Sequence, residues 1–405
     1  MNDRRDLGWV LAGQFLGALA DNALLLVAIA LLMERHAPAW NAPALRMVFY
    51  LSYVLLSAFG GAAADAWPKK RVLFAINLLK LCGGGLLLTQ VNPLLAYGLV
   101  GIGAAAHAPA RYGILSELGE PGALLAANAW MEVATVLALL LGTLWGGLML
   151  QGVAVLPPLS GGSIASGAAF TLAGTYLLAA LCTLPVRSHA ASNPDALQRP
   201  GALLKEFARC ARLLWRDAQA RTSLAVSSTF WAAAAVLQFV VLQWATERLG
   251  LALSGAGMLQ AAVACGMIAG AAAAGRWLRE ERALALLPMG LALAGMLASM
   301  ALVRSVQAAA VLLFTIGSLS GLLVVTMNTV LQRRGLALAH SGEAIAVQNW
   351  SENLASLVGL AIYGAALLLH AAVVPTVEAM GFLVALAMLG TACLGRPLRP
   401  DHTPR

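Results

Sequence analysis

The chain has 405 residues, of which 60% are hydrophobic and 11% are charged, and its formal net charge is +8. Soluble domains are roughly 45–50% apolar and about 25% charged, so this composition excludes a soluble enzyme, a disordered protein and a secreted disulfide scaffold. The five cysteines include no Cys-x-x-Cys pair, so the pattern typical of a zinc site is absent.

Twelve apolar segments are long enough to cross a membrane as helices, which takes about 20 residues each. They lie near residues 8–33, 45–65, 72–90, 93–110, 124–150, 164–185, 222–246, 255–277, 283–303, 307–330, 343–369 and 374–394. The long stretch 186–221 divides them into two sets of six. We therefore predict an all-α integral membrane protein with an N-terminal six-helix half (1–185), a cytoplasmic linker (186–221) and a C-terminal six-helix half (222–405).

Basic residues indicate how the chain is oriented in the membrane. With the N-terminus placed in the cytoplasm, 21 of the 26 Lys and Arg residues fall in cytoplasmic segments. The outer segments contain four, namely Arg35, Arg46, Arg248 and Arg304. Because an excess of Lys and Arg marks the cytoplasmic side, we predict that both termini lie inside the cell. The same distribution explains the net charge without a nucleic-acid partner.

The second part of the linker, 203–219, has the pattern of an amphipathic helix. Leu203, Phe207 and Trp215 fall on its apolar face, and four basic residues fall largely on the other face. Such helices are typical of segments that lie on anionic inner-leaflet lipid. A specific lipid-binding role and a plain linker resting on the membrane are the two alternatives, and the sequence favours the plain linker.

Polar residues inside the spans are candidates for a transport path, because an ionisable side chain in the membrane usually faces a cavity or a partner. Asp21 and Asn22 lie in the middle of the first span, and Lys80 lies in the third. Further polar residues lie in spans 5, 7 and 11, namely Asn128, Glu132, Gln238, Gln243, Gln348, Asn349 and Glu352. The alternative for any one of them is a pairing that merely locks two helices together.

The two halves share a weak repeat. In each half an Arg and a Gly lie at the cytoplasmic end of a helix, and Asn, Trp and Glu follow in the next span. In the first half these residues are Arg111, Gly113, Asn128, Trp130 and Glu132. In the second half they are Arg334, Gly335, Asn349, Trp350 and Glu352. A parallel duplication of six helices predicts this equivalence. Gly-x-x-x-Gly spacings at 142–146 and 266–270 indicate closely packed helices.

The segment between spans 2 and 3 carries Gly61, Asp65 and the basic run 69–71. This resembles the Gly-x-x-x-Asp-x-x-x-x-Arg loop signature of the major facilitator superfamily, with Pro68 in place of a glycine within the loop. The resemblance implies that superfamily's fold and a gating role for Gly61, Asp65 and Arg71.

Longer motifs resemble the bacterial lysophospholipid transporter family, LplT. They are QFLGALADNALL at 14–25, GIGAAAHAPARYGIL at 101–115, NAWME at 128–132 and AIAVQNWSEN at 344–353. The resemblance implies movement of lysophosphatidylethanolamine and related lipids from the outer to the inner leaflet of the bacterial inner membrane, with no cofactor, metal or catalytic residue. In that family an acyl-ACP synthetase/acyltransferase re-acylates the product, and we expect it to be a separate protein here.

The resemblance also implies roles for individual residues. Asp21 and the glutamates are expected to meet an ammonium group, and Lys80 or Arg111 a phosphate; Asn22, Asn128, Gln348 and Asn349 also fall on family motif positions. Gln238 stands where the family pattern can carry Arg. If that Arg pairs with the Asp of span 1, Asp21 needs another partner here, and Arg111 and Lys80 are the candidates.

Three other functions are considered. A drug or metabolite transporter of the same superfamily, with proton coupling through Asp21 or Glu132, is the closest alternative. An intramembrane acyltransferase would need His107 or His340 as a base, and neither lies in an HxxxxD or CxH pattern. A scaffold without transport gives the buried carboxylates no purpose.

Overall fold

A computed structural model describes residues 2–36, 41–89, 91–118, 124–152, 164–187, 190–191, 193–195, 197, 200–251, 253–278 and 285–394. These residues form thirteen α-helices and no β-strand. In chain order the helices are α1 (Asn2–Glu34), α2 (Asn41–Ala66), α3 (Lys69–Leu86), α4 (Pro93–Leu118), α5 (Leu124–Leu150), α6 (Ile164–Leu181), α7 (Pro200–Arg216), α8 (Ala218–Leu249), α9 (Leu253–Trp277), α10 (Leu287–Ser299, followed by the 3-10 turn η3, Met300–Leu302), α11 (Val306–Leu338), α12 (Ser341–Leu368) and α13 (Val373–Leu394).

Nine of these helices are long and apolar enough, over their described residues, to cross a membrane. The other four are α3, α6, α7 and α10. Helices α6 and α10 are apolar but short, α3 carries three basic residues in its first turn and Lys80 further on, and α7 lies in the predicted linker. The all-helical membrane architecture is confirmed, whereas the count of twelve crossings depends on α3, α6 and α10 and stays a prediction.

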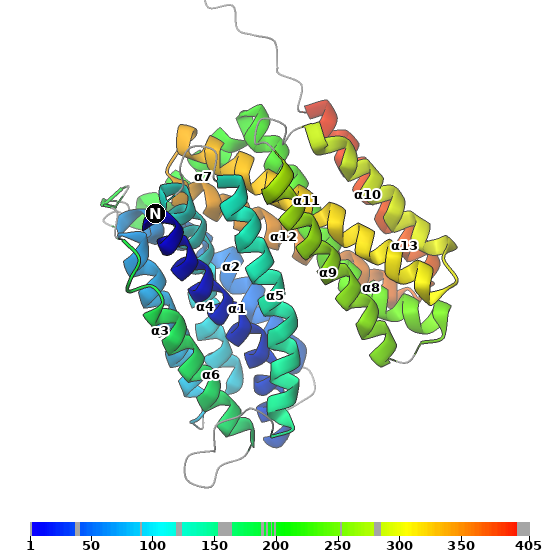
Figure 1. Cartoon of the computed structure of the whole chain (residues 1–405), viewed down its shortest axis with the longest axis horizontal. Helices are drawn as coiled ribbons and strands as arrows, with labels where there is room; N and C mark the ends of the chain where they lie inside the picture. Colours follow the sequence, from blue (N-terminus) through cyan, green and yellow to red (C-terminus); the bar gives the residue numbers. More distant parts are fainter. Residues whose placement is uncertain are drawn as a thin grey trace, which may run out of the picture. The chain divides into compact units, whose positions relative to one another are not determined.

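The chain packs as two compact units. The first comprises Met1–Phe207 and Ala339–Trp350, and the second comprises Ala208–Leu338 and Ser351–Arg405. Within the first unit, α1 packs against α5 and α6, and α4 packs against α2 and α3 (Figure 1). A Cβ at Gly146 would meet the backbone of Ala23 at 2.9 Å, so this glycine allows α1 and α5 to approach closely.

The tightest crossing in the second unit joins α9 to α11. Gly266 and Gly270 of α9 face α11, and Gly317 and Gly321 of α11 face α9. A Cβ at any of these four positions would overlap a backbone carbonyl of the facing helix. Small residues give such crossings their van der Waals contact in lipid, where the hydrophobic effect does not drive association.

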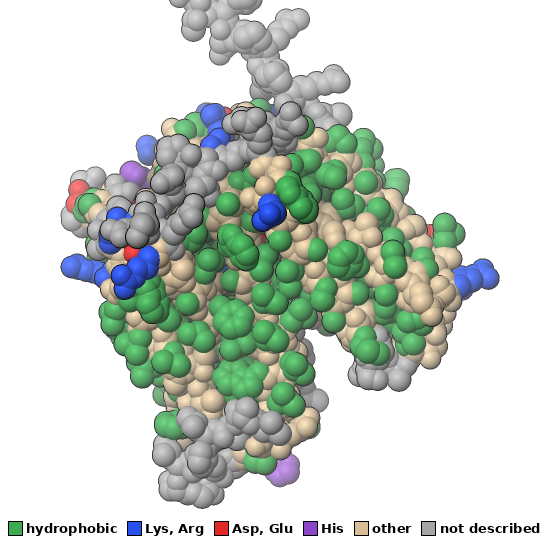
Figure 2. All heavy atoms as spheres, viewed as in Figure 1, with side chains coloured by type: hydrophobic (Ala, Val, Ile, Leu, Met, Phe, Trp, Pro, Cys, Tyr) green, Lys and Arg blue, Asp and Glu red, His purple; other side chains and the backbone are tan. Residues whose placement is uncertain are grey.

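The surface is largely apolar. Hydrophobic side chains are spread over the whole face seen in Figure 2, with few charged groups among them. Leu55, Leu144, Val311 and Phe382 are each more than half exposed. Exposure of this extent marks an interaction surface in a soluble protein, and here it is the surface that a bundle of membrane helices presents to lipid.

Candidate functional site

Asp21 of α1 and Lys80 of α3 form an ion pair within the first unit. Lys80 Nζ lies 2.6 Å from Asp21 Oδ2, and the side chains are 2% and 18% exposed for the lysine and the aspartate respectively. The sequence predicts both residues as charges inside membrane spans, and the fold brings them together. Of the two candidate partners for Asp21, the structure places Lys80 at the carboxylate.

Tyr176 of α6 completes this site, and no sequence pattern singles it out. Its hydroxyl donates a 2.8 Å hydrogen bond to Asp21 Oδ1, and the side chain is fully buried. Gly103 of α4 makes room for the lysine, because a Cβ there would lie 3.0 Å from Lys80 Cγ. One carboxylate thus joins α1, α3 and α6, and we call Asp21, Lys80 and Tyr176 the ion-pair site.

The energetics of the ion-pair site favour keeping both charges matched. A buried ion pair adds little net stability, because the Coulombic gain barely offsets the cost of desolvation. Removing one partner lowers the free energy of unfolding by roughly 3–5 kcal/mol, because it leaves an uncompensated buried charge. Replacement of either side chain by another ion of the same sign avoids this loss.

Asn22 and Asn128 are the two predicted asparagines of the N-terminal half. The Asn22 side chain donates a 2.8 Å bond to the carbonyl of Ala18 within α1, and its Cβ faces Gly142 of α5. Asn128 of α5 is buried at 1% exposure.

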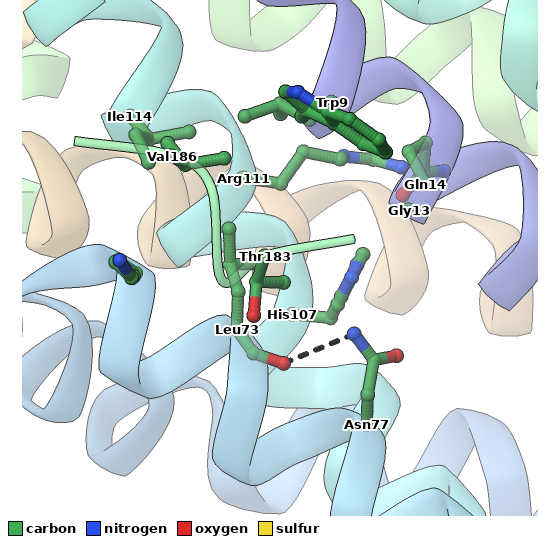
Figure 3. Close-up of a pocket in the computed structure, with 12 residues that line it drawn as sticks. Trp9, Gly13, Gln14, Leu73, Asn77, His107, Arg111, Ile114, Thr183 and Val186 are labelled. Atoms are coloured by element: carbon green, nitrogen blue, oxygen red, sulfur yellow. Dashed lines mark hydrogen bonds between the residues drawn. The ribbon is translucent and has the colours of Figure 1, made fainter. Parts of the chain in front are cut away.

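A second polar group lies between α1, α4 and α5. In Figure 3, Arg111 extends from α4 toward Trp9 and Gln14 of α1. Gln14 Nε2 donates a 3.0 Å bond to Thr135 Oγ1 of α5, and Glu132 of α5 is buried at 2% exposure and interacts electrostatically with Arg111.

Several buried atoms of this group have no hydrogen-bond partner in the described part of the chain, namely Gln14 Oε1, Arg111 Nε, Glu132 Oε1 and, beside them, Asn77 Oδ1. Asn77 and His107 line the same cleft (Figure 3). The cleft has room for about one water molecule. Its polar atoms suit water, and a lipid headgroup would not fit there without movement.

Two of the three predicted gating residues, Gly61 and Asp65, lie at the start of α12. Asp65, fully buried at the end of α2, accepts 3.0 Å bonds from the backbone N–H groups of Gly342 and Glu343. A Cβ at Gly61 would lie 3.0 Å from the carbonyl of Gly342. The carboxylate therefore caps α12, where the helix dipole favours negative charge.

The basic residues of the same loop differ in their contacts. Lys69 is buried and pairs with Glu117 of α4, whereas Arg71 is exposed. Of these two residues, Lys69 is therefore the one that binds a neighbouring helix through an ion pair. The sequence motif alone does not distinguish Lys69 from Arg71.

The predicted glutamines of span 7 lie in the second unit. Gln238 of α8 is exposed, and its backbone carbonyl accepts a bond from the Gln260 side chain of α9. Gln243 accepts a 3.0 Å bond from the Tyr363 hydroxyl of α12. Both are hydrogen-bonded between helices.

The α12 candidates are divided between the two units. Gln348 and Asn349, 4% and 9% exposed, lie in the part of α12 that packs with the first unit. Glu352 is 8% exposed and lies in the part that packs with the second. The predicted path residues of α12 thus belong to both units.

The repeated arginines have different partners. Arg334 of α11 binds Asp217 through two nitrogens, with Nε 3.0 Å from Oδ1. Asp217 also caps α8 by accepting a 2.9 Å bond from the Ala220 N–H. Arg111 forms no ion pair with a described residue, and its guanidinium lies 4.4 Å from the ring centre of Tyr112. Among the described residues, Arg111 thus lacks the ion pair that Arg334 has.

Comparison with known proteins adds two kinds of similarity. The Major Facilitator Superfamily profile matches residues 10–360. Proteins named lysophospholipid transporter LplT from Yersinia pestis (strain Pestoides F) and Yersinia pseudotuberculosis serotype I (strain IP32953) are each 38% identical over 371 residues, covering 91% of this chain and 89% of theirs.

Solved structures share the fold at low sequence identity. A variant of the E. coli fucose:proton symporter FucP aligns with a TM-score of 0.76 at 13% identity, covering 98% of this chain and 99% of its own. The human organic anion transporter MFSD10 aligns with a TM-score of 0.72 at 18% identity, covering 98% and 100%.

Proposed function

The chain belongs to the Major Facilitator Superfamily and, within it, to the lysophospholipid transporter LplT family, and from that premise we propose that it moves lysophosphatidylethanolamine and related lysophospholipids from the outer to the inner leaflet of the bacterial inner membrane. Residues 1–185 and 222–405 form its two six-helix halves, joined by the linker 186–221. Twelve crossings with both termini in the cytoplasm fit the placement of 21 basic residues in cytoplasmic segments.

The ion-pair site is the observation that carries this proposal. Lysophosphatidylethanolamine has an ammonium and a phosphate in its head, and Asp21 and Lys80 offer the complementary charges 2.6 Å apart. The head replaces the internal pair, with its ammonium on Asp21 and its phosphate on Lys80. Because each buried charge keeps an opposite partner, the exchange avoids leaving an unpaired ion in the membrane.

The remaining polar residues extend the path from this site. Arg111 takes the phosphate next, since it has no ion pair of its own among the described residues. Asn22, Asn128, Glu132, Gln238, Gln348, Asn349 and Glu352 supply the other polar contacts. The acyl chain lies in an apolar opening at the side of the protein that faces the bilayer, because lipid and Leu-rich helix faces are equally favourable surroundings for it.

Alternating access uses the cap on α12. Gly61, Asp65 and Arg71 form the gating loop, and Asp65 holds the start of α12 in one state and releases it in the other. We expect an acyl-ACP synthetase/acyltransferase to re-acylate the delivered lysolipid. A gene for such an enzyme beside this one would support that link.

Movement of labelled lysophosphatidylethanolamine between the leaflets of proteoliposomes tests the exchange. Asp21→Asn is expected to slow it roughly 10- to 100-fold, because a bond to a charged group is worth about 1.5–3 kcal/mol. The double variant Asp21→Asn/Lys80→Met leaves no unpaired ion, so it should melt like the parent protein and still transport slowly. Thr143→Val is the matched control, since this exposed hydroxyl of α5 bonds within its own helix.

Two results would contradict the proposal. Full transport by the double variant would remove the ion-pair site from the path. Proton-driven movement of a soluble compound, without movement of lysolipid, would favour the drug or metabolite transporter.

A further inference from the structure

Helix α7 has an inner face that is covered by protein. Leu203 packs with Ala62 and Ala66 of α2, and the ring of Phe207 meets the edge of Trp350 of α12 at a centroid distance of 6.3 Å. The sequence predicts that this apolar face meets lipid. That expectation is corrected for Leu203 and Phe207, because helices of the first unit cover them.

The opposite side of α7 is exposed, and we call it the outer face. It carries four exposed cations at helical spacing, Lys205, Arg209, Arg212 and Arg216. Next to them lies an apolar flank on which Leu204 is 63% and Trp215 is 42% exposed. Glu206 is the one acidic residue of the helix, and it is partly buried.

We propose that the outer face of α7 is a docking surface for anionic phospholipids of the cytoplasmic leaflet. The cations would meet the lipid phosphates, and Leu204 and Trp215 would enter the headgroup boundary. Charge complementarity selects this occupant, because the surface of that leaflet is negative and attracts basic helices. Helices that lie in the membrane interface have this arrangement, in which an apolar flank runs beside a basic stripe. This surface is separate from the transport path.

The inner face connects this surface to the gate. Leu203 touches the last turns of α2, and Phe207 touches α12. Asp65 lies in the same last turns of α2, where its side chain caps α12 and its carbonyl accepts a 2.8 Å bond from the backbone N–H of Asn193 in the linker. Lipid docking on α7 therefore strengthens the contact between α2 and α12 that Asp65 makes.

Backbone hydrogen exchange of the full chain in lipid nanodiscs tests the proposal. Discs of zwitterionic lipid are compared with discs that also contain phosphatidylglycerol. We expect slower exchange in α7 and at residues 342–346 when phosphatidylglycerol is present. Each cation is expected to contribute about a fivefold change, from about 1 kcal/mol per basic residue near an anionic surface.

Variants of the outer face of α7 distinguish an effect of its charge from an effect on folding. Lys205→Gln/Arg209→Gln/Arg212→Gln/Arg216→Gln should abolish the response to phosphatidylglycerol, whereas Arg209→Lys/Arg212→Lys/Arg216→Lys should retain it. Arg248→Gln/Arg304→Gln, at positions predicted on the other side of the membrane, is the control. The proposal is overturned if α7 exchanges equally in both lipids, if the four-Gln variant still responds, or if protection appears only when an acidic protein is added.

Discussion

The Tyr176 hydroxyl and Lys80 divide the two carboxylate oxygens of Asp21 between them. Tyr176 donates to Oδ1 at 2.8 Å, and Lys80 Nζ lies 2.6 Å from Oδ2. Tyr176 therefore fixes the position of the carboxylate while Lys80 neutralises its charge. If the lysine is exchanged for a substrate ammonium, the tyrosine bond keeps Asp21 in place.

Removing this hydroxyl should loosen the ion-pair site without changing its charge. Tyr176→Phe is expected to cost about 1.5–3 kcal/mol, because the lost bond is to an ionised group. We expect a lower thermal midpoint and several-fold slower lysolipid transport. Tyr363→Phe makes the same chemical change at a neutral acceptor, Gln243, and should cost less. Equal losses in both variants would argue against a special role for Tyr176.

The cap on α12 predicts a graded response at Asp65. Asp65→Ala removes both bonds to the start of the helix and should cost about 1–2 kcal/mol, whereas Asp65→Asn retains a capping oxygen and should cost less. Exchange of the Gly342 and Glu343 amides reports the cap directly. It should accelerate most in Asp65→Ala, and unchanged exchange there would exclude the carboxylate as the cap.

The Asp217–Arg334 pair predicts a pH-dependent contribution to stability. Burial raises the pKa of Asp217, but the Arg334 guanidinium and the Ala220 N–H lower it more, so the pKa lies below its usual 3.8. The stabilisation is therefore complete at pH values above 3.8 and is lost as the pH falls through the lowered pKa. Near neutral pH, Asp217→Asn should destabilise the chain by about 1 kcal/mol, since the pair is partly exposed.

Thermal midpoints of the parent and Asp217→Asn chains, measured against pH, check this sign. The difference between them should be constant near neutral pH and shrink in strong acid. A difference that grew toward low pH would contradict it. Asp217→Ala also removes the cap on α8 and should add about another 1 kcal/mol.

The crossing of α9 and α11 predicts a steep cost for one methyl group. Gly270→Ala places a Cβ against the carbonyl of Ser318, and such overpacking typically costs about 1–3 kcal/mol. Gly295→Ala, in α10 with open space around it, makes the same change without a clash and should be neutral or slightly stabilising. The thermal midpoints of the two variants, each measured against the parent protein, test this prediction. A Gly270→Ala chain as stable as the parent would refute the close crossing.

The sequence predicts features that depend on local chemistry. Asp21 and Lys80 stand out because a charge is rare in an apolar span. The loop signature at 61–71 identifies the superfamily correctly, and the longer motifs identify the family correctly. Tyr176 could not be found this way, because a tyrosine in an apolar helix looks like ordinary core. Its role depends on a contact with a residue 155 positions away.

The contacts of Asp65 and of α7 could not be predicted from the sequence either, because they join residues far apart in the chain. Asp65 is recognisable by its loop signature, but its partners lie 277 and 278 positions later. Helix α7 is recognisable as amphipathic, yet periodicity cannot tell whether Phe207 meets lipid or Trp350. Some helices also continue past the predicted apolar segment, as in α4, which runs through Pro109 to Leu118.

The pairing of Asp21 with Lys80 has a consequence for the response to voltage. A zwitterionic head that replaces this pair brings no net charge into the membrane, so its transfer should be insensitive to the membrane potential. A lysolipid whose phosphate has no matching ammonium would move one negative charge. That charge couples to the field by about 2.3 kcal/mol per 100 mV, so an imposed diffusion potential should change the transport rate of anionic lysolipids and leave that of lysophosphatidylethanolamine unaltered.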